Sequence, residues 1–345
     1  MLQIKPVDNR QDLRRFIRLP WLIYANDPAW VPPLMLERKE QLSPHNPYFE
    51  HAKFHSWIAF RDGHAVGRIS AQVDQLHLDR YKKKEGFFGM IEAEDNAETF
   101  AALLQTAESW LRDQGMQRIL GPYNLSINQE PGLLVDGFDT PPCVMMGHAR
   151  PYYGPRIEEN GYQKSKDLFA YIMDSNFTHS AAMRTIVKRA QNRVSIRSLR
   201  KSYFDEDLKI IEDIFNDAWL ENWGFIPFTE AEFKQLGKDF KLIVDFELIK
   251  IAEVDGVPGA MLVVMPNINE AIRDLNGKLL PFGWIRLLWR LKVRHPETVR
   301  IPLMGVRRQY QNSLLGAGLA FMMIVSVQAP GIKTRHKKSR TVMDS

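Results

Sequence analysis

Cysteine is almost absent from the sequence, whose 345 residues contain only Cys143. An internal disulfide is therefore impossible, which excludes the disulfide-stabilised secreted domains and fits a reducing compartment. The histidines His55, His64, His77 and His148 lack the paired spacing that is typical of metal ligands. We therefore predict no metal site.

Long apolar runs are also missing. The longest, Leu314–Val327, is shorter than the roughly 20 residues that a membrane-spanning helix needs. The segment Met1–Arg18 is charged throughout and has no apolar stretch of the kind found in secretory signals. We therefore expect a cytoplasmic protein. The composition, 45% hydrophobic and 25% charged, is that of a globular protein, and the length suits two domains.

Acidic residues are scarce in two basic segments. Residues 331–345 carry five lysines or arginines against one aspartate, a net charge of +4, which leaves +1 of the total +5 for residues 1–330. The stretch Arg184–Lys201 contains seven basic residues and no acid. It is interpreted either as a solvated helix face or as a surface that contacts phosphates, as in DNA-binding proteins. The sequence has no helix-turn-helix or zinc-finger spacing.

An internal repeat is present in the chain. The segments Ser56–Asp74 and Glu247–Met265 each read as two β-strands joined by an Asp-Gly turn, which favours a tight hairpin. Each hairpin follows a helix-rich segment and precedes a strand and a helix, so we predict two α/β units. The predicted divisions are residues 1–175, which close with a strand at Leu168–Met173, residues 176–327, and a disordered basic tail at residues 328–345.

The segment Val299–Ile324 predicts an anion site in the second unit. A strand-like run there passes through a polar loop into an apolar helix, and the first turn of a helix offers unpaired N–H groups and a positive dipole end. A pyrophosphate is expected to bind at this loop. The candidate residues are Val306, Arg307, Arg308, Gln311, Ser313, Gly316 and Ala317.

The first unit has a different set of polar residues. Glu92, Glu94 and Asp95 stand at the corresponding strand end, and their carboxylates would repel a pyrophosphate. In the following loop, Asn124, Ser126 and Asn128 would share one face of an extended segment, with Glu130 nearby as a base. The same residues are equally suited to a structural hydrogen-bond network.

The segment Leu279–Arg294 predicts a basic amphipathic helix with two tryptophans. Such a helix either lies in a membrane interface or covers a sheet with its basic face in water. If it lies in an interface, we expect the protein to act on a long-chain amine or another lipid. It would then be a peripheral membrane protein at the inner face of the membrane.

The order of these elements resembles the GNAT N-acyltransferase fold. The runs GPYNLSINQEPGLLVDGFDTPP, PYYGPRIEENGYQKSKDLFAY, NDAWLENWGF and LLPFGWIRLLW resemble a bacterial family of tandem GNAT-like proteins, the YghO type, to which a bacterial ceramide synthase is related. The resemblance implies an α/β fold with two GNAT-like units. It also implies transfer of an acyl group from acyl-CoA or acetyl-CoA, as co-substrate, to an amine.

The resemblance also suggests roles for individual residues. The GNAT pyrophosphate loop, Q/R-x-x-G-x-G/A, matches at Gln311 and Gly316, but Leu314 replaces its first glycine and would crowd the phosphate. The base would be Glu130 or Glu221. The acid for the departing thiolate would be Tyr152 or Tyr153, and the acceptor pocket would contain Trp219, Asn222, Trp223 and Phe225.

A complete GNAT domain continues with another strand and helix after its pyrophosphate-loop helix. Gln328–Ser345 has neither strand alternation nor a helical stripe, so the second unit is expected to be incomplete. On this basis the chain either retains acyl transfer or has lost it. The alternative is a non-catalytic binding protein, including a DNA-binding transcriptional regulator that uses Arg184–Lys201.

Overall fold

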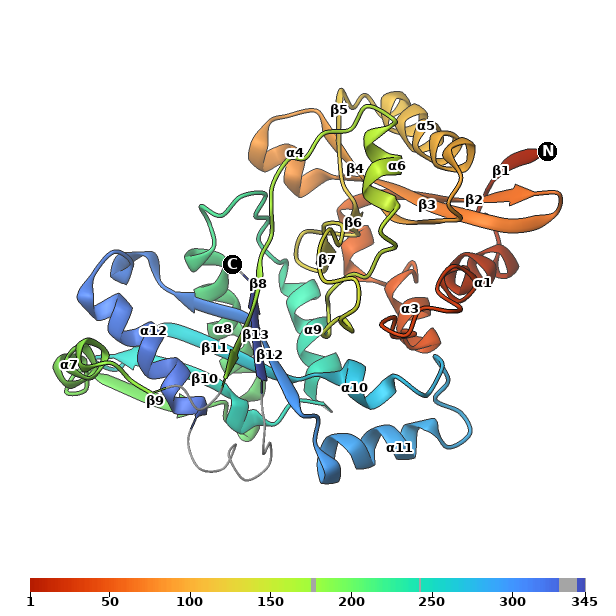
Figure 1. Cartoon of the computed structure of the whole chain (residues 1–345). Helices are drawn as coiled ribbons and strands as arrows, with labels where there is room; N and C mark the ends of the chain where they lie inside the picture. Colours follow the sequence, from red (N-terminus) through yellow and green to blue (C-terminus); the bar gives the residue numbers. More distant parts are fainter. Residues whose placement is uncertain (175–177, 242, 329–339, 345) are drawn as a thin grey trace. The chain divides into compact units, whose positions relative to one another are not determined.

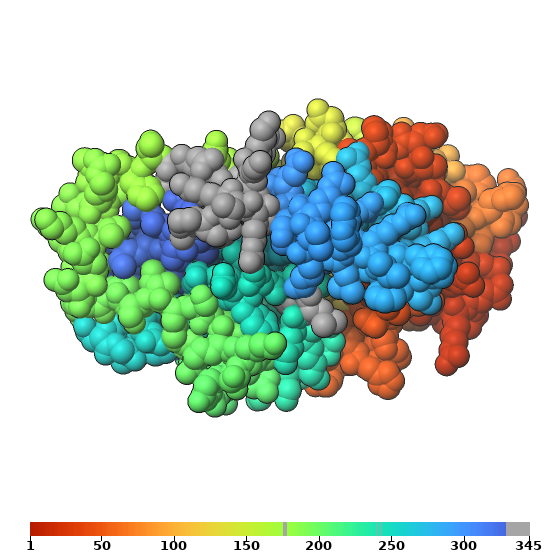
Figure 2. All heavy atoms as spheres, turned by 90° about the horizontal axis from the view of Figure 1, so that it is seen from below, coloured from red at the N-terminus to blue at the C-terminus, as the bar shows by residue number. Residues whose placement is uncertain are grey.

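The computed structural model describes residues 1–174, 178–241, 243–328 and 340–344. It divides into two compact units (Figure 1; Figure 2 shows one face with all heavy atoms). Unit 1 comprises Met1–Asp167 together with Ile272–Pro281, and unit 2 comprises Leu168–Ala271 together with Phe282–Ser345. The first division therefore falls earlier than the predicted residue 175, and a short segment from the second half belongs to unit 1.

Unit 1 is built on a five-stranded sheet. Its strands lie in the order β1 (Leu2–Pro6), β2 (Ala52–Arg61), β3 (His64–Asp74), β4 (Glu85–Ala93) and β5 (Arg118–Leu120). Neighbouring strands are antiparallel except β4 and β5, which are parallel. The predicted Asp62-Gly63 hairpin is present, and both turn residues have positive φ angles, as a tight turn requires.

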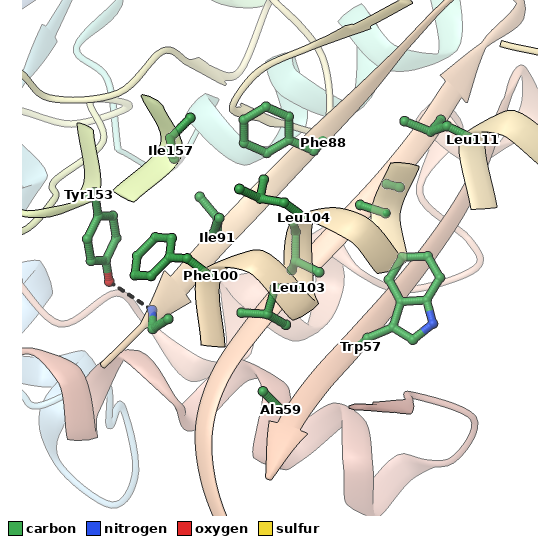
Figure 3. Close-up of a cluster of buried hydrophobic side chains, with 14 of the residues drawn as sticks. Trp57, Ala59, Phe88, Ile91, Phe100, Leu103, Leu104, Leu111, Tyr153 and Ile157 are labelled. Carbon is green, nitrogen blue, oxygen red and sulfur yellow. Dashed lines mark hydrogen bonds between the residues drawn. The ribbon is translucent and has the colours of Figure 1, made fainter. Parts of the chain in front are cut away.

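Helices and short elements complete unit 1. They are α1 (Arg10–Arg18), α2 (Pro20–Ile23), α3 (Met35–Gln41), η1 (Pro47–Glu50), α4 (Gln75–Tyr81), α5 (Ala97–Asp113), β6 (Tyr123–Asn124), β7 (Glu130–Pro131) and α6 (Tyr153–Glu158). The apolar stripe of α5 is buried against one face of the sheet, where Phe100, Leu103 and Leu104 meet Trp57 and Phe88 (Figure 3). Alternate strand residues such as Ile58 pack on the opposite face with α1.

Unit 2 has a six-stranded sheet. The order is β8 (Ala170–Asp174), β13 (Arg340–Asp344), β12 (Thr298–Val306), β11 (Val257–Pro266), β10 (Ile249–Val254) and β9 (Val194–Ser198), and only β12 and β13 are parallel. The strand predicted at Leu168–Met173 thus belongs to this second sheet. Within the segment predicted to be disordered, residues 340–344 form a strand between β12 and β8.

Both faces of the second sheet carry helices. The helical elements are α7 (Ala181–Ala190), η2 (Lys201–Tyr203), α8 (Phe204–Ala218), α9 (Glu230–Lys241), η3 (Phe246–Leu248), α10 (Ile268–Ile272), α11 (Gly283–Trp289), the π-helical turn η4 (Arg290–Arg294), η5 (Arg308–Tyr310) and α12 (Leu314–Val327). Leu319 and Met323 of α12 pack on Leu262 of β11. The next residue of that strand, Val263, faces a cavity bordered by α8 and α9. None of the helices in the part described is long and apolar enough to cross a membrane.

A buried carboxylate fastens α8 to the end of β9. Asp207 is 0% exposed and accepts hydrogen bonds from Arg197 Nη1 (2.9 Å), Arg200 N (2.8 Å) and Arg200 Nη2 (2.7 Å). Burial by itself favours the protonated form, but the hydrogen bonds from Arg200 and Arg197 outweigh it and hold the pKa of Asp207 below its ordinary value.

We expect Asp207→Asn to lower the free energy of unfolding by about 2 kcal/mol at neutral pH, because two arginines lose a buried partner. Since the folded-state pKa is depressed, the stabilisation is present above the unfolded pKa and is lost as the pH falls through the folded one. Urea unfolding at several pH values measures both effects. Glu206→Gln on the same helix is the control, because that exposed side chain lies 3.9 Å from Arg200. Equal stability of the two variants would contradict the prediction.

Candidate functional site

Strand β4 of unit 1 contains a bulge. Its register against β3 shifts between the pairs Ser70–Gly89 and Arg68–Glu92, and Met90 between them has a φ of 48°. Met90 N donates to Asn124 Oδ1 at 2.7 Å. The bulge therefore links β4 to β6 and positions the Glu92 side chain.

A group of polar side chains, here called the unit 1 cluster, gathers beside this bulge; its members are Tyr24, Arg38, Arg68, Glu92, Asn124, Glu130 and Tyr153. Arg38 Nη2 donates to Glu130 Oε1 at 2.6 Å, and Asn124 Nδ2 donates to Glu130 Oε2 at 3.0 Å. Both oxygens of Glu130 are thus engaged. Burial opposes ionisation of Glu130, but the charge and hydrogen bond of Arg38 prevail, so its pKa is lowered. Glu130, one of the two predicted bases, is the anion of an ion pair with Arg38.

Glu92 is the contrasting carboxylate of the cluster. Its side chain is 14% exposed, and its Oε2 accepts a hydrogen bond from Tyr153 Oη at 2.7 Å. The nearest guanidinium nitrogen of Arg68 is 3.7 Å away. Burial raises the pKa of Glu92 above its ordinary value despite Arg68 and the tyrosine hydroxyls. A carboxylate with a raised pKa is better suited to accept a proton near neutral pH than Glu130 is.

The remaining predicted residues of this loop have structural contacts. Residues 125–129 form a turn, in which Ser126 Oγ accepts Asn128 N at 3.1 Å, so the three polar side chains do not share one face of an extended strand as predicted. Leu125 begins the turn with a φ of 80°. This positive φ breaks the alternation on which that prediction depended.

Tyr152 and Tyr153 both contact the end of β4. Tyr152 Oη donates to Ala93 O at 2.8 Å, and burial raises the pKa of Tyr152 to about 12. Tyr153 is buried, donates to Glu92, and accepts Ala93 N at 3.2 Å (Figure 3). Burial raises the pKa of Tyr153 still further, so its hydroxyl stays protonated and orients Glu92.

Ion pairs surround the first turn of α5, the helix that follows β4. Arg61 donates to Glu94 and Glu98, and Arg156 donates to Asp95. The parallel pairing of β4 with β5 ends at Phe87, after which the backbone of β6 lies against β4. A Cβ atom on Gly89 would lie 1.7 Å from Tyr123 O. The backbone of β6 thus fills the space beside β4 beyond the pairing with β5.

Unit 2 differs at the equivalent strand. Its parallel pairing of β12 with β13 covers Thr298 to Ile301, whereas β12 itself continues to Val306. The chain then passes through η5 to α12. Ser313 caps that helix, its Oγ accepting Gly316 N at 3.0 Å. A strand edge that extends beyond its parallel partner therefore leads directly to a capped helix N-terminus.

The polar residues predicted for this loop hold it against α8. Gln311 Nε2 donates to Val306 O at 2.8 Å and to Ala218 O at 3.1 Å. Arg307 pairs with Asp213 and also donates to Pro258 O at 2.8 Å. These contacts fix the loop's shape.

Several residues of the loop region are exposed to solvent. Arg308 pairs with the exposed Glu221, so the predicted base lies beside the loop. Leu314, which stands in the place of the glycine, is 65% exposed. Ala317 is also exposed, whereas Gly316 is buried.

The four residues predicted to form the acceptor pocket lie in different surroundings. Trp219 Nε1 donates to Met304 O at 2.8 Å, on the part of β12 beyond the pairing with β13. Phe225 is buried against Phe215, with ring centroids 5.5 Å apart. Asn222 and Trp223 are exposed. Trp219 is therefore attached to the part of β12 beyond its described pairing with β13.

An apolar cavity of about 30 Å³ lies under α8 and α9. Its lining includes Phe204, Leu208, Phe233, Val263 and Leu303. Leu303 belongs to the part of β12 beyond its described pairing with β13. The volume is about that of one water molecule, so the cavity is a packing void between the helices and the sheet.

No family model matches the chain. It is 49% identical to Protein YghO of Escherichia coli (strain K12) over 323 residues, which cover 93% of this chain and 83% of that protein. It is 48% identical to the bacterial ceramide synthase of Caulobacter vibrioides (strain NA1000 / CB15N) over 326 residues, 94% of this chain and 85% of that one. The chain belongs to the family of these two proteins. The resemblance predicted from the sequence is confirmed.

Comparison with solved structures gives the same fold. A tandem GNAT protein from the clavulanic acid biosynthesis pathway, determined without AcCoA, matches 100% of this chain and 90% of its own length. The TM-score is 0.52 at 10% sequence identity. The α/β fold with two GNAT-like units in tandem is thus as predicted for this family member.

Sequence reasoning overlooked several residues of the unit 1 cluster. Arg38, Arg68 and Tyr24 come from three separate elements, and only the folded chain brings them to Glu92. The one available signal was Glu92 itself, an ionisable residue at the end of the apolar strand GFFGMIEA. Within the described ranges, no group of three or more acidic, histidine or cysteine side chains is suited to a metal.

Proposed function

We propose that this protein is an N-acyltransferase that transfers the acyl group of an acyl-CoA to an amine with a long hydrocarbon chain. The amine nitrogen would attack the thioester carbonyl, an amide bond would form, and the carbon–sulfur bond would break. The amine proton would pass to a base and the thiolate would leave as free CoA. The observation that carries the proposal is the end of β12, which continues beyond its described pairing with β13 and is followed by the capped N-terminus of α12, in a family that includes a protein named a bacterial ceramide synthase.

The start of α12 fits an anionic group for physical reasons. The first N–H groups of a helix have no intrahelical acceptor, and the helix dipole adds positive charge at this end. Gly316 N donates its hydrogen to the capping Ser313 hydroxyl. Leu314 and Leu315 come before Gly316 in the first turn of α12. Arg308 adds a guanidinium that Glu221 partly neutralises. The exposed Leu314 is the one departure from the GNAT loop pattern.

The direct test is a reaction with defined substrates. Purified protein would be mixed with acyl-CoAs from acetyl to stearoyl and with a long-chain amino alcohol or a short alkylamine. Mass spectrometry would detect the amide, and a thiol reagent would detect free CoA. We expect amide and CoA in equal amounts with the long-chain acceptor. If no acyl-CoA yields amide and none raises the melting temperature at millimolar concentration, the proposal is wrong.

We further propose that, within the unit 1 cluster, Glu92 is the residue that accepts a proton, in place of Glu130. Glu92→Gln is expected to lower kcat by about 100-fold, because general base catalysis typically contributes 100-fold to 10,000-fold. It should leave the melting temperature unchanged or raised, because the raised folded-state pKa means that ionised Glu92 disfavours folding at neutral pH.

Glu130→Gln is the matched control for Glu92→Gln. It should cost about 2 kcal/mol of stability by breaking the ion pair with Arg38. Initial rates from pH 5 to 9 and thermal unfolding of both variants provide the measurements. A large loss of stability in Glu92→Gln, or an unchanged pH profile, would show that Glu92 is structural.

The DNA-binding alternative has weaker support. Within Arg184–Lys201, Arg197 and Arg200 are engaged by Asp207, and Arg193 is paired with Asp255. The basic charge available to a phosphate backbone is therefore smaller than the sequence suggests. Binding to a DNA duplex with a steep salt dependence would favour this alternative.

A further inference from the structure

The segment from Phe282 to Arg294, which contains α11 and η4, exposes an unusual amount of apolar surface. Six large apolar side chains in it are between 42% and 67% exposed, namely Phe282, Trp284, Ile285, Leu288, Trp289 and Val293. Large exposed apolar patches on soluble proteins commonly mark a surface that binds a partner or a membrane.

The segment is anchored through other residues. Leu291 is buried, and Arg290 Nη1 donates to Ala271 O at 2.8 Å. Phe282, Ile285 and Trp289 are spaced three and four residues apart, so they follow one side of the helical segment. Of the two interpretations of this helix, the one in which its apolar side covers a sheet leaves the exposure of these side chains unexplained.

The charged side chains within this segment have a single sign. Arg286, Lys292 and Arg294 are exposed. No aspartate or glutamate occurs between Asp274 and Glu297. A partner surface that covers the segment must therefore tolerate or supply negative charge.

We propose that the segment Phe282–Arg294 lies in the interface of an anionic lipid bilayer. Aromatic and aliphatic side chains would enter the headgroup region, and the three basic side chains would contact lipid phosphates. The observations favour lipid over a second copy of the chain, because two identical basic segments would repel each other. The inference goes beyond the proposed reaction and does not depend on it, although it would bring the enzyme to a lipid acceptor.

Vesicle sedimentation tests this inference on the full chain. Wild-type protein would be mixed with vesicles of phosphatidylcholine alone or with 40% phosphatidylglycerol, about that fraction being typical of an anionic test membrane. We expect binding to be at least about tenfold stronger with the anionic lipid and to weaken at high salt. The triple variant F282S/I285S/W289S should lose about tenfold in binding to anionic vesicles.

Two further variants make the result specific. R286E/K292E/R294E should abolish the preference for anionic lipid. V257S removes an apolar side chain that is 56% exposed at the β10–β11 turn and should bind like the wild type.

Failure of the wild type to bind anionic vesicles overturns the inference, as does unchanged binding of the triple variant. A dimer in light scattering that the triple variant dissociates would assign the surface to a second copy. Acyl transfer to a detergent-solubilised amine, measured alongside, shows separately whether the proposed reaction holds.

Discussion

Gly89→Ala is expected to lower the free energy of unfolding by about 3 kcal/mol, the upper part of the range for an overpacked core site. An added Cβ would lie 1.7 Å from Tyr123 O, far inside contact distance. Neither partner can move aside freely, because Gly89 lies in a buried central strand next to the bulge at Met90. The variant therefore has to displace the backbone of β6.

That displacement would break a set of buried hydrogen bonds. Gln72 Nε2 donates to Tyr123 O at 2.8 Å and to Leu125 O at 3.0 Å, and Gln72 is 0% exposed. Asn124 is tied to Met90 N and to Glu130. Moving β6 would thus strand buried polar groups and disturb the unit 1 cluster, which adds to the steric cost.

Urea denaturation measures the effect, with Gly154→Ala as the control. Gly154 lies in α6 and has no atom within 4 Å of an added Cβ, so alanine there should be neutral or slightly stabilising. We also expect Gly89→Ala to reduce acyl transfer even at temperatures where the variant remains folded. Wild-type stability in Gly89→Ala would mean that β6 is not held against β4 as described.

Local signals in the sequence were reliable for the elements that they encode. The two Asp-Gly hairpins appear as predicted, because turn geometry depends on neighbouring residues. Strand β13 could not be predicted in this way. Its sequence, RTVMD, lacks alternation, and its partners β12 and β8 lie far away in the chain. Pairing between distant segments decides such a strand.

In the candidate site too, local features could be predicted from the sequence, whereas contacts between distant residues could not. Sequence reasoning identified the loop from Val306 to Ala317 from its position between a strand and a helix. It could not predict that the pKa of Glu92 is raised while that of Glu130 is lowered. The guanidinium that lowers the pKa of Glu130 belongs to Arg38 in α3, far away in the sequence. Nor could it tell which side of α11 is exposed, since an amphipathic pattern gives the apolar side without saying what covers it.

Gly316→Ala is expected to lower kcat/KM for acyl-CoA by about 100-fold, equivalent to about 2.7 kcal/mol. An added Cβ would lie 2.1 Å from Tyr310 O, which also accepts the hydroxyl hydrogen of Ser313 at 2.6 Å. The side chain would therefore push the loop away from the first turn of α12 and displace the cap. Alanine favours a helix more than glycine does, so the loss would come from the loop's shape and not from helix propensity.

Leu314→Ala, two residues earlier, is the matched variant. Its side chain is exposed, so the melting temperature should stay close to that of the wild type. If this leucine crowds the phosphate, its removal should improve acyl-CoA binding by a few fold, whereas Gly316→Ala should weaken it. Thermal shifts across an acyl-CoA titration measure both. Undiminished binding by Gly316→Ala would place the pyrophosphate elsewhere, because a ligand held at this helix start cannot be indifferent to a distorted first turn.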